Sequence, residues 1–215
     1  MRVGVLLSGN GTTMEAITEE FNVVVVMSDN ARAKGLEKAR KLNIPTVSLE
    51  PNTTTYEPTL SGLLQLYQVD VICLAGYLQI VREPTLTMFK DKIMNIHPAL
   101  LPAFRGRDPQ KQAVEYGAKV TGNTIHFVDQ GIDTGAIILQ STVPIREGDT
   151  EKEISEVLTK DGHLLYLKAL SLYKEGRLVI EGRKVSILPR AVELPKKSMR
   201  VSRELQGPRG ISTKV

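Results

Sequence analysis

Asn95 and His97 are the residues whose types and spacing most directly suggest chemistry in this sequence. Side chains of a β-strand alternate between its two faces, so a separation of two places both on the same face. They stand at the end of a predicted strand, residues 93–96, and open α/β sheets bind ligands beyond the carboxyl ends of their strands. An asparagine amide can donate to a developing oxyanion, and a histidine can carry a proton at neutral pH. The spacing alone is equally compatible with a structural histidine.

A second candidate, Asp133, lies in a loop with the sequence Asp-Gln-Gly-Ile-Asp-Thr-Gly over residues 129–135. The loop separates two long predicted strands, residues 120–128 and 136–144. A carboxylate there that reached His97 would raise the pKa of the histidine and fix its tautomer. The same composition is also typical of an ordinary turn, in which Asp and Gly serve only the backbone conformation.

The first loop of the chain, Ser-Gly-Asn-Gly-Thr-Thr over residues 8–13, joins a predicted strand to a predicted helix. A glycine-rich turn at the positive end of a helix lets backbone N–H groups converge on an anion, which favours a phosphate. A dinucleotide site built on Gly9, Gly11 and Asp29 is one alternative, although Met14 stands where that motif needs its third glycine. The other alternative is a tight strand-to-helix turn without a ligand.

A metal site is not expected, because the three histidines, His97, His126 and His163, occur in no HxxxH pattern and the single cysteine in no CxxC pattern. His126 lies on a predicted strand and is either a supporting residue of the site or a core histidine with satisfied hydrogen bonds. His163 lies on a long predicted helix and is expected to be structural. Cys73 lies within an apolar strand, where a buried and unreactive thiol is expected. A lone cysteine forms no internal disulfide, which predicts a reducing cytoplasm.

The elements that must position these residues alternate between strand and helix in the first half of the chain. Two β-branched runs, residues 2–7 and 22–27, are mostly apolar, as strands buried on both faces are. Such alternation implies a single-domain α/β fold of Rossmann-like type, with a mostly parallel twisted sheet and helices on both faces. After residue 98 the pattern changes and predicts antiparallel or irregular strands. The expected strands cover residues 2–7, 22–27, 46–49, 69–74, 93–96, 120–128, 136–144, 177–180 and 184–188, and the expected helices residues 12–20, 35–42, 55–67, 84–90, 110–116 and 150–173.

The chain of 215 residues is 41% hydrophobic and 24% charged, which is typical of one globular domain. Its longest apolar stretches, residues 23–27 and 71–76, are far shorter than a membrane span, and its first residues lack the pattern of a signal peptide. Seven Lys or Arg and two Glu fall in residues 189–215, which predicts a domain over residues 1–188 followed by a basic tail. The remainder carries 21 basic and 22 acidic residues, and this near-neutral body argues against a nucleic-acid partner. RNA association through the tail is the alternative to a solvated terminus.

Five motifs in this order resemble the formyltransferases that use 10-formyltetrahydrofolate, and among these the phosphoribosylglycinamide formyltransferases of purine biosynthesis. The resemblance extends over residues 1–188. The motifs are residues 8–11, 74–77, 95–102, 122–128 and 133–135. The resemblance implies that a cytoplasmic enzyme transfers a formyl group from 10-formyltetrahydrofolate, its cosubstrate, to the amine of 5′-phosphoribosylglycinamide without a metal.

The resemblance also implies a role for each matching residue. Asn95, His97 and Asp133 match the family's catalytic trio. In these roles Asn95 and a protonated His97 would stabilise an oxyanion, while Asp133 would keep His97 protonated and orient a water. Replacement of any of the three by alanine is expected to remove most activity while the chain still folds. The phosphate of the ribonucleotide is expected at Gly11, Thr12 and Thr13, its ribose at Asp161, and the pterin at Tyr77, Leu78, Gln79, Ile80, Val81, Val128, Asp129, Gln130, Gly131 and Ile132.

Three positions depart from the family pattern. Thr13 stands where relatives usually have Asn, Gln79 stands where many have Arg, and Gly162 stands at the place of an acid that contacts the ribose, with Asp161 beside it. The main alternative is a relative with another formyl acceptor. Methionyl-tRNA formyltransferases carry a further C-terminal domain and formyltetrahydrofolate hydrolases a further N-terminal one, and the length of this chain favours neither. Only small-molecule partners are expected, for a monomer or a homodimer.

Overall fold

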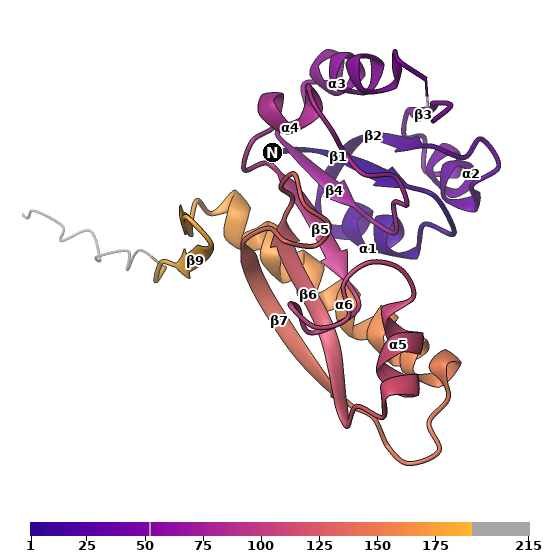
Figure 1. Cartoon of the computed structure of the whole chain (residues 1–215). Helices are drawn as coiled ribbons and strands as arrows, with labels where there is room; N and C mark the ends of the chain where they lie inside the picture. The colour runs from indigo at the N-terminus through magenta and orange to yellow at the C-terminus, as the bar shows by residue number, and fades with distance from the viewer. Residues whose placement is uncertain (52, 191–215) are drawn as a thin grey trace, which may run out of the picture.

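A mixed sheet of nine strands runs through the part of the chain that the structure describes, residues 1–51 and 53–190 of a computed structural model. The strand order is β3-β2-β1-β4-β5-β6-β7-β9-β8, and helices cover both faces of the sheet (Figure 1). Strands β1 to β5 are parallel to one another, whereas β6 is antiparallel to both of its neighbours, β5 and β7. The predicted α/β fold with a mostly parallel sheet is therefore confirmed.

The parallel half of the sheet follows from the apolar runs of the sequence. All four residues of β4 are buried, as expected for a strand covered on both faces. Cys73 lies in this strand, and burial raises the pKa of its thiol to about 12, which confirms the prediction of a buried, unreactive cysteine. The elements of this half are β1 (Arg2–Leu7), α1 (Thr12–Glu20), β2 (Asn22–Ser28), α2 (Lys34–Lys41), β3 (Thr46–Ser48), α3 (Tyr56–Leu66), β4 (Val71–Leu74), α4 (Thr85–Met88) and β5 (Ile93–His97).

The sheet turns antiparallel at β6, which pairs with β5 in a register that sets His126 opposite Asn95 and Thr124 opposite His97. β6 and β7 form a long hairpin that extends away from the parallel half of the sheet (Figure 1). The following helix begins with a capping box, in which the Thr150 hydroxyl accepts a hydrogen bond from the backbone N–H of Glu153. The elements of this half are α5 (Pro109–Tyr116), β6 (Val120–Phe127), β7 (Ile137–Pro144), α6 (Glu151–Lys174), β8 (Leu178–Glu181) and β9 (Lys184–Ile187).

The two faces of the sheet pack into separate hydrophobic cores. Val5 of β1 contributes to the core that α1, α2 and α6 cover, whereas its neighbour Leu6 contributes to the core that α3 covers. On β5, Ile96 packs toward the α6 side, so the alternation of side chains directs Asn95 and His97 to the α3 side. This alternation decides which residues of β6 can reach them.

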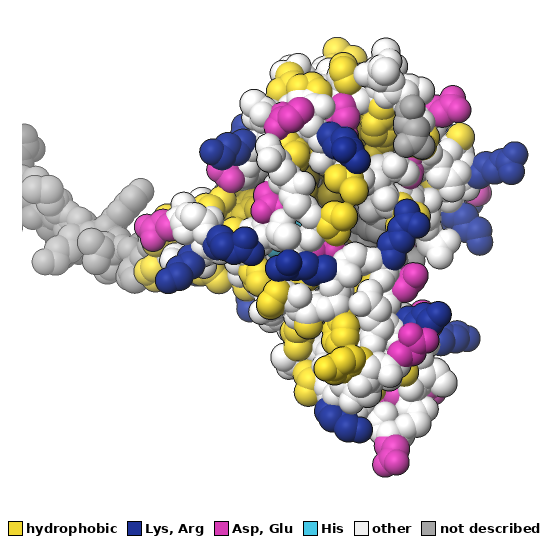
Figure 2. Space-filling view, viewed as in Figure 1, with side chains coloured by type: hydrophobic (Ala, Val, Ile, Leu, Met, Phe, Trp, Pro, Cys, Tyr) yellow, Lys and Arg dark blue, Asp and Glu magenta, His cyan; other side chains and the backbone are white. Residues whose placement is uncertain are grey.

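Predicted element boundaries agree with the observed ones to within two residues. The predicted basic tail lies outside the described residues beyond Arg190, whose guanidinium contacts the Glu175 carboxylate at 3.0 Å. The domain boundary at residue 188 therefore stays a prediction. Among the described helices, none combines the length and the apolar composition needed to cross a membrane. On the face shown in Figure 2, basic and acidic side chains are interspersed rather than gathered by sign.

Candidate active site

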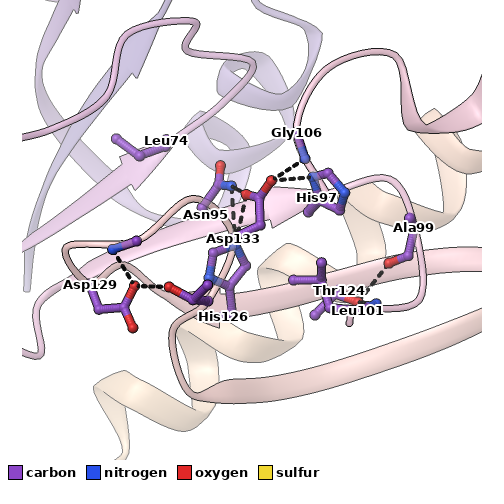
Figure 3. A network of polar contacts seen from close by, with 12 residues as sticks. Leu74, Asn95, His97, Ala99, Leu101, Gly106, Thr124, His126, Asp129 and Asp133 are labelled. Carbon is purple, nitrogen blue, oxygen red and sulfur yellow. Dashed lines mark hydrogen bonds and ion pairs between the residues drawn. The ribbon is translucent and has the colours of Figure 1, made fainter. Parts of the chain in front are cut away.

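Asn95, His97 and Asp133 come from separate stretches of the chain and meet at the carboxyl end of β5 (Figure 3). Oδ2 of Asp133 lies 3.3 Å from Nδ1 of His97, and Oδ1 of Asp133 lies 3.5 Å from Nδ2 of Asn95. His97 is only 4% exposed, so these contacts are shielded from bulk water. An amide, an imidazole and a carboxylate therefore border one small volume.

The loop between β6 and β7 that carries Asp133 has a backbone that few residue types adopt. Asp133 itself has a φ of 51°, in the left-handed region that Asp tolerates better than most residues. Asp129 orders the loop, because its Oδ1 accepts a hydrogen bond from the Thr134 hydroxyl at 2.6 Å. A Cβ on Gly135 would lie 1.7 Å from the carbonyl oxygen of Phe127, so this position requires glycine. The turn chemistry of the loop and the placement of Asp133 therefore depend on one another.

His126 contacts both Asn95 and Asp133, a role that the sequence left open. Its Nδ1 lies 2.8 Å from the carbonyl oxygen of Phe127, and because a carbonyl only accepts hydrogen bonds, Nδ1 carries a proton. In the neutral ring Nε2 then accepts a hydrogen bond from Nδ2 of Asn95 at 3.2 Å. This contact directs the amide nitrogen of Asn95, rather than its oxygen, toward Asp133. The contact arises from the pairing of β5 with β6, which sets His126 opposite Asn95. The sequence of either strand alone does not reveal that pairing.

Two backbone groups of the loop after β5 complete the surroundings of the pair. The carbonyl oxygen of Phe104 lies 2.8 Å from Nε2 of His97, and the N–H of Gly106 donates to Oδ2 of Asp133 at 2.9 Å (Figure 3). Because the carbonyl only accepts, Nε2 of His97 carries a proton, and Nδ1 is where the ring gains a second one. Sequence reasoning missed these contacts, since almost every residue has the same backbone groups.

The pKa of His97 bears on the prediction that Asp133 keeps this ring protonated at neutral pH. Burial lowers the pKa of His97 below its ordinary value of 6.5, and this effect exceeds the opposing effects of the Asp133 carboxylate and the Phe104 carbonyl. Burial also acts to raise the pKa of Asp133, but the neighbouring His126 ring, the hydrogen bond from the Gly106 N–H and the His97 ring together outweigh it and hold that pKa below its ordinary value. The lowered pKa of His97 runs against that prediction, and it favours a neutral imidazole beside an ionised carboxylate at pH 7.

The lowered pKa of His97 makes the stability of the fold depend on pH. A histidine whose pKa is lower in the folded chain binds more protons when unfolded, so stability decreases as the pH falls through 6.5. Burial lowers the pKa of His163 as well, which adds an effect of the same sign. We expect the free energy of unfolding in urea to be smaller at about pH 5.5 than at about pH 7.5, and the difference to shrink in His97→Gln. Equal stability at the two pH values would contradict the lowered pKa.

The predicted phosphate loop begins α1. Gly11 is the N-cap with a φ of 73°, and no side chain of the described residues caps the helix, so its first backbone N–H groups lack intrahelical partners. A Cβ on Gly11 would lie 2.6 Å from Cα of Gly35, so only glycine lets the loop pack against α2. Glu15 in the first turn would repel an anion, but Lys38 pairs with it at 2.7 Å. The helix start at residues 11–13 therefore keeps its positive potential.

A cavity of about 430 Å³ lies between α1 and α6, beside this loop. Thr12 lines it together with Lys160 and His163 of α6. Lys160 and His163 are three positions apart on one helix and therefore share a face. This position does not test the prediction that His163 is structural, which stays a prediction.

Asp161, which was predicted to contact the ribose, is engaged elsewhere. Its Oδ2 accepts hydrogen bonds from the amide of Asn123 at 2.8 Å and from the hydroxyl of Ser141. Asn123 precedes Thr124 on β6 and so faces the α6 side of the sheet, opposite to the side of His97. The structure therefore does not bring Asp161 to the trio, and its contact with a ribose stays a prediction.

The ten residues predicted to line a pterin pocket lie on two loops, one after β4 and one after β6. Val81 and Val128, one from each loop, pack against the same hydrophobic core on the α3 side of the sheet. Leu78, Ile80 and Ile132 are instead 66%, 45% and 54% exposed. The two loops thus present apolar side chains to solvent near the site, an arrangement typical of a ligand-binding surface.

Gln79 differs from the other residues predicted to line the pterin pocket, because its side chain contacts Asp29, the residue that follows β2. Its amide donates to Oδ2 of Asp29 at 2.8 Å, and this engages the carboxylate on which the dinucleotide alternative depended. Gln79 also lines a cavity of about 380 Å³ with Tyr56 and Arg82, and residues 128–132 do not contribute to that cavity. The two predicted pterin loops therefore do not share this cavity.

Comparison with known proteins agrees with these features. A model of the formyl transferase family matches residues 1–170. The chain is 38% identical over 176 residues to phosphoribosylglycinamide formyltransferase of Bacillus subtilis, and this match covers 77% of this chain and 90% of the relative. The chain is 36% identical over 195 residues to the trifunctional purine biosynthetic protein adenosine-3 of Bos taurus, covering 85% of this chain but only 19% of that longer relative. Glycinamide ribonucleotide transformylase 1 from Symbiobacterium toebii superposes with a TM-score of 0.85 at 46% identity, covering 88% of this chain and 94% of the other. With its fold, its site and these matches in agreement, the chain belongs to the formyl transferase family.

Proposed function

We propose that this protein transfers the formyl group of 10-formyltetrahydrofolate to the amine of 5′-phosphoribosylglycinamide, in de novo purine biosynthesis. Relatives that match most of the chain are named phosphoribosylglycinamide formyltransferase or glycinamide ribonucleotide transformylase. The observation that carries the proposal is the meeting of Asn95, His97 and Asp133, because an amide donor and an imidazole–carboxylate pair can act on one reacting carbonyl. A cytoplasmic location suits a chain whose cysteine, Cys73, is a buried free thiol.

Asn95 and the His97–Asp133 pair divide the work of formyl transfer. As the amine bonds to the formyl carbon, the amine must lose a proton, the carbonyl oxygen gains negative charge, and the leaving nitrogen of the folate must gain a proton. The Asn95 N–H toward Asp133 is held only at 3.5 Å, so it is the donor available to the charged oxygen. Neutral His97 takes the amine proton at Nδ1, beside the ionised Asp133, and returns it to the leaving nitrogen as the carbon–nitrogen bond breaks.

The two substrates have complementary surfaces on either side of the trio. A phosphate suits the start of α1 at Gly11, Thr12 and Thr13, with Lys160 of the neighbouring cavity as a counter-charge. The flat aromatic faces of a pterin suit the exposed apolar side chains of the loops after β4 and β6. With both ends held, the amine and the formyl carbon are brought together at the trio, and this proximity supplies a large part of catalysis.

The proposal is tested by offering purified protein 10-formyltetrahydrofolate with one acceptor at a time. The acceptors are 5′-phosphoribosylglycinamide, water alone and aminoacylated tRNA, and the release of tetrahydrofolate is followed by absorbance. We expect release only with the ribonucleotide, and a formylated ribonucleotide as product. Release with water alone would instead show a hydrolase, and release with the tRNA would show a different transferase. His97→Ala in the same assay reports any contaminating activity of the host.

A further inference from the structure

We infer that Gln112 of α5 is a positioning residue for the proposed reaction, because its side-chain amide holds the loop whose backbone contacts His97 and Asp133. The kinetic part of this inference rests on the proposed function. Its geometric part rests only on the contacts of the loop of residues 104–108, here called the 104–108 loop. The proposed chemistry uses the side chains of the trio and assigns nothing to α5.

The 104–108 loop contacts each member of the imidazole–carboxylate pair by a backbone group. The Phe104 carbonyl oxygen is 2.8 Å from Nε2 of His97, and the Gly106 N–H is 2.9 Å from Oδ2 of Asp133. The Phe104 carbonyl holds the ring by the nitrogen that faces away from Asp133, and the Gly106 N–H contacts the same carboxylate oxygen that Nδ1 of His97 contacts at 3.3 Å. Any displacement of the loop therefore changes the geometry of the pair.

The conformation of the 104–108 loop needs support from outside the loop. Phe104 and Asp108 have φ values of 50° and 52°, in the left-handed region that non-glycine residues rarely adopt. Arg105 and Arg107 are exposed, so burial of their side chains does not hold the loop in place. Contacts made by the loop backbone must supply that support.

Gln112 supplies this support from the second turn of α5. Its Nε2 donates to the carbonyl oxygen of Arg107 at 2.7 Å, with a longer contact of 3.5 Å to that of Arg105. One amide group thus binds the carbonyls on both sides of Gly106, the residue whose N–H contacts Asp133. The side chain is exposed, so it has no evident role in the hydrophobic core.

Two further contacts show how the loop is held at its other points. The Phe104 ring packs edge-on against Tyr116, with ring centroids 5.8 Å apart, and Tyr116 lies one helical turn after Gln112 on the same face of α5. Before the loop, the buried Thr124 hydroxyl donates to the Ala99 carbonyl at 2.7 Å and accepts from the Leu101 N–H at 3.1 Å. β6 therefore fixes the entry to the loop, and α5 fixes the loop itself.

The kinetic test uses Gln112→Met, which keeps the length of the side chain but removes its donor, and Gln112→Glu, which keeps its shape but can only accept. We expect kcat for formyl transfer to fall by a factor between about 10 and 10², since small misplacements of reacting groups have effects of this size. KM for phosphoribosylglycinamide should stay within about twofold, because residue 112 does not contact the phosphate loop. Gln112→Glu should be at least as impaired, because its carboxylate repels the two carbonyls.

The control variant is Lys111→Met on the same helix. Lys111 is exposed and pairs with Glu115 at 3.8 Å, so its loss perturbs the surface of α5 without touching the 104–108 loop. Wild-type kcat is expected for this variant. Thermal unfolding of all variants separates a local effect on the pair from general destabilisation.

A second test does not need activity. Because the chain has only three histidines, its proton NMR spectrum contains few imidazole signals. The signal that remains in both His126→Gln and His163→Gln is assigned to His97. The groups that face His97 are Asp133, His126 and the Phe104 carbonyl, of which the carboxylate and the carbonyl raise its pKa. A displaced loop in Gln112→Met changes both the burial of the ring, which lowers the pKa of His97, and the contact with the Phe104 carbonyl, which raises it. The titration midpoint of His97 should therefore move away from its wild-type value, while Lys111→Met leaves it unchanged.

The inference is overturned if Gln112→Met keeps both the wild-type kcat and the wild-type midpoint of His97, or if Lys111→Met shows the same losses. If the wild type transfers no formyl group to the ribonucleotide, the proposed function fails, and the midpoint of His97 alone then decides whether Gln112 holds the loop.

Discussion

Replacement of His97 by alanine is expected to lower kcat for formyl transfer by a factor on the order of 10²–10⁴, the usual effect of removing a positioned acid–base group. In the proposed mechanism the ring carries the proton between the attacking amine and the leaving nitrogen, and it is held between Asp133 and the Phe104 carbonyl. KM should change little, because the proposed mechanism places His97 at the reacting atoms rather than at the phosphate or the pterin. Steady-state kinetics with both substrates varied gives the two parameters separately.

The interpretation requires that the variant folds. His97 is buried and its removal leaves a polar carbonyl unpaired, so some loss of stability is expected alongside the loss of activity. Circular dichroism and urea unfolding measure the folded fraction under assay conditions. A folded His97→Ala protein with wild-type kcat would remove His97 from the mechanism.

Asp133→Asn is expected to have a comparable effect, up to a factor of about 10⁴, as when a carboxylate that supports a catalytic histidine is replaced by its amide. The substitution keeps the shape of the side chain but removes the charge that stabilises His97 once it has taken a proton. It also weakens the hydrogen bond from the Gly106 N–H, because an amide oxygen is a poorer acceptor than a carboxylate. The pH profile of the residual activity should reflect the altered pKa of His97.

Asp91→Asn is a matched control for the charge change. Asp91 has a φ of 60°, a conformation that Asn also tolerates, and it precedes β5 at the end of the strand opposite to His97. Wild-type kinetics are expected for this variant. The double variant His97→Ala, Asp133→Asn should lose little more than either single one, because residues that act as a unit are not additive. Full additivity would mean that the two side chains act independently.

The fold was predictable from the sequence because its signals are local. Apolar runs such as β4 and the helical spacing of α1 depend on neighbouring residues only, and their order implies a parallel sheet. The residue types of the trio were predictable as well, because Asn95 and His97 share one face of a strand by spacing alone. The association of Asp133 with them came from resemblance to a family, since no periodicity connects a loop aspartate to a strand that lies far from it in the sequence.

Other features of the site depend on groups that the sequence does not mark. His126 meets Asn95 through the register of two antiparallel strands, and Phe104 and Gly106 act by backbone atoms. Asp161 was predicted for the ribose from its neighbour in the sequence, yet its carboxylate joins α6 to Asn123 on the other face of the sheet. In each case, the packing of segments that are far apart in the sequence determines which face of the sheet or which partner a residue contacts.

The sequence by itself determined the order of strands and helices, the glycines that the tight loops require, and the kinds of side chain available for proton transfer and anion binding. Only the tertiary structure decided the direction in which the pKa of His97 is shifted, because burial opposes the Asp133 carboxylate and exceeds it. It also decided that the 104–108 loop encloses the pair and that α5 holds this loop in place. The physical reason is that backbone preference and apolar period act between near neighbours, whereas desolvation and strand register arise when distant segments pack together.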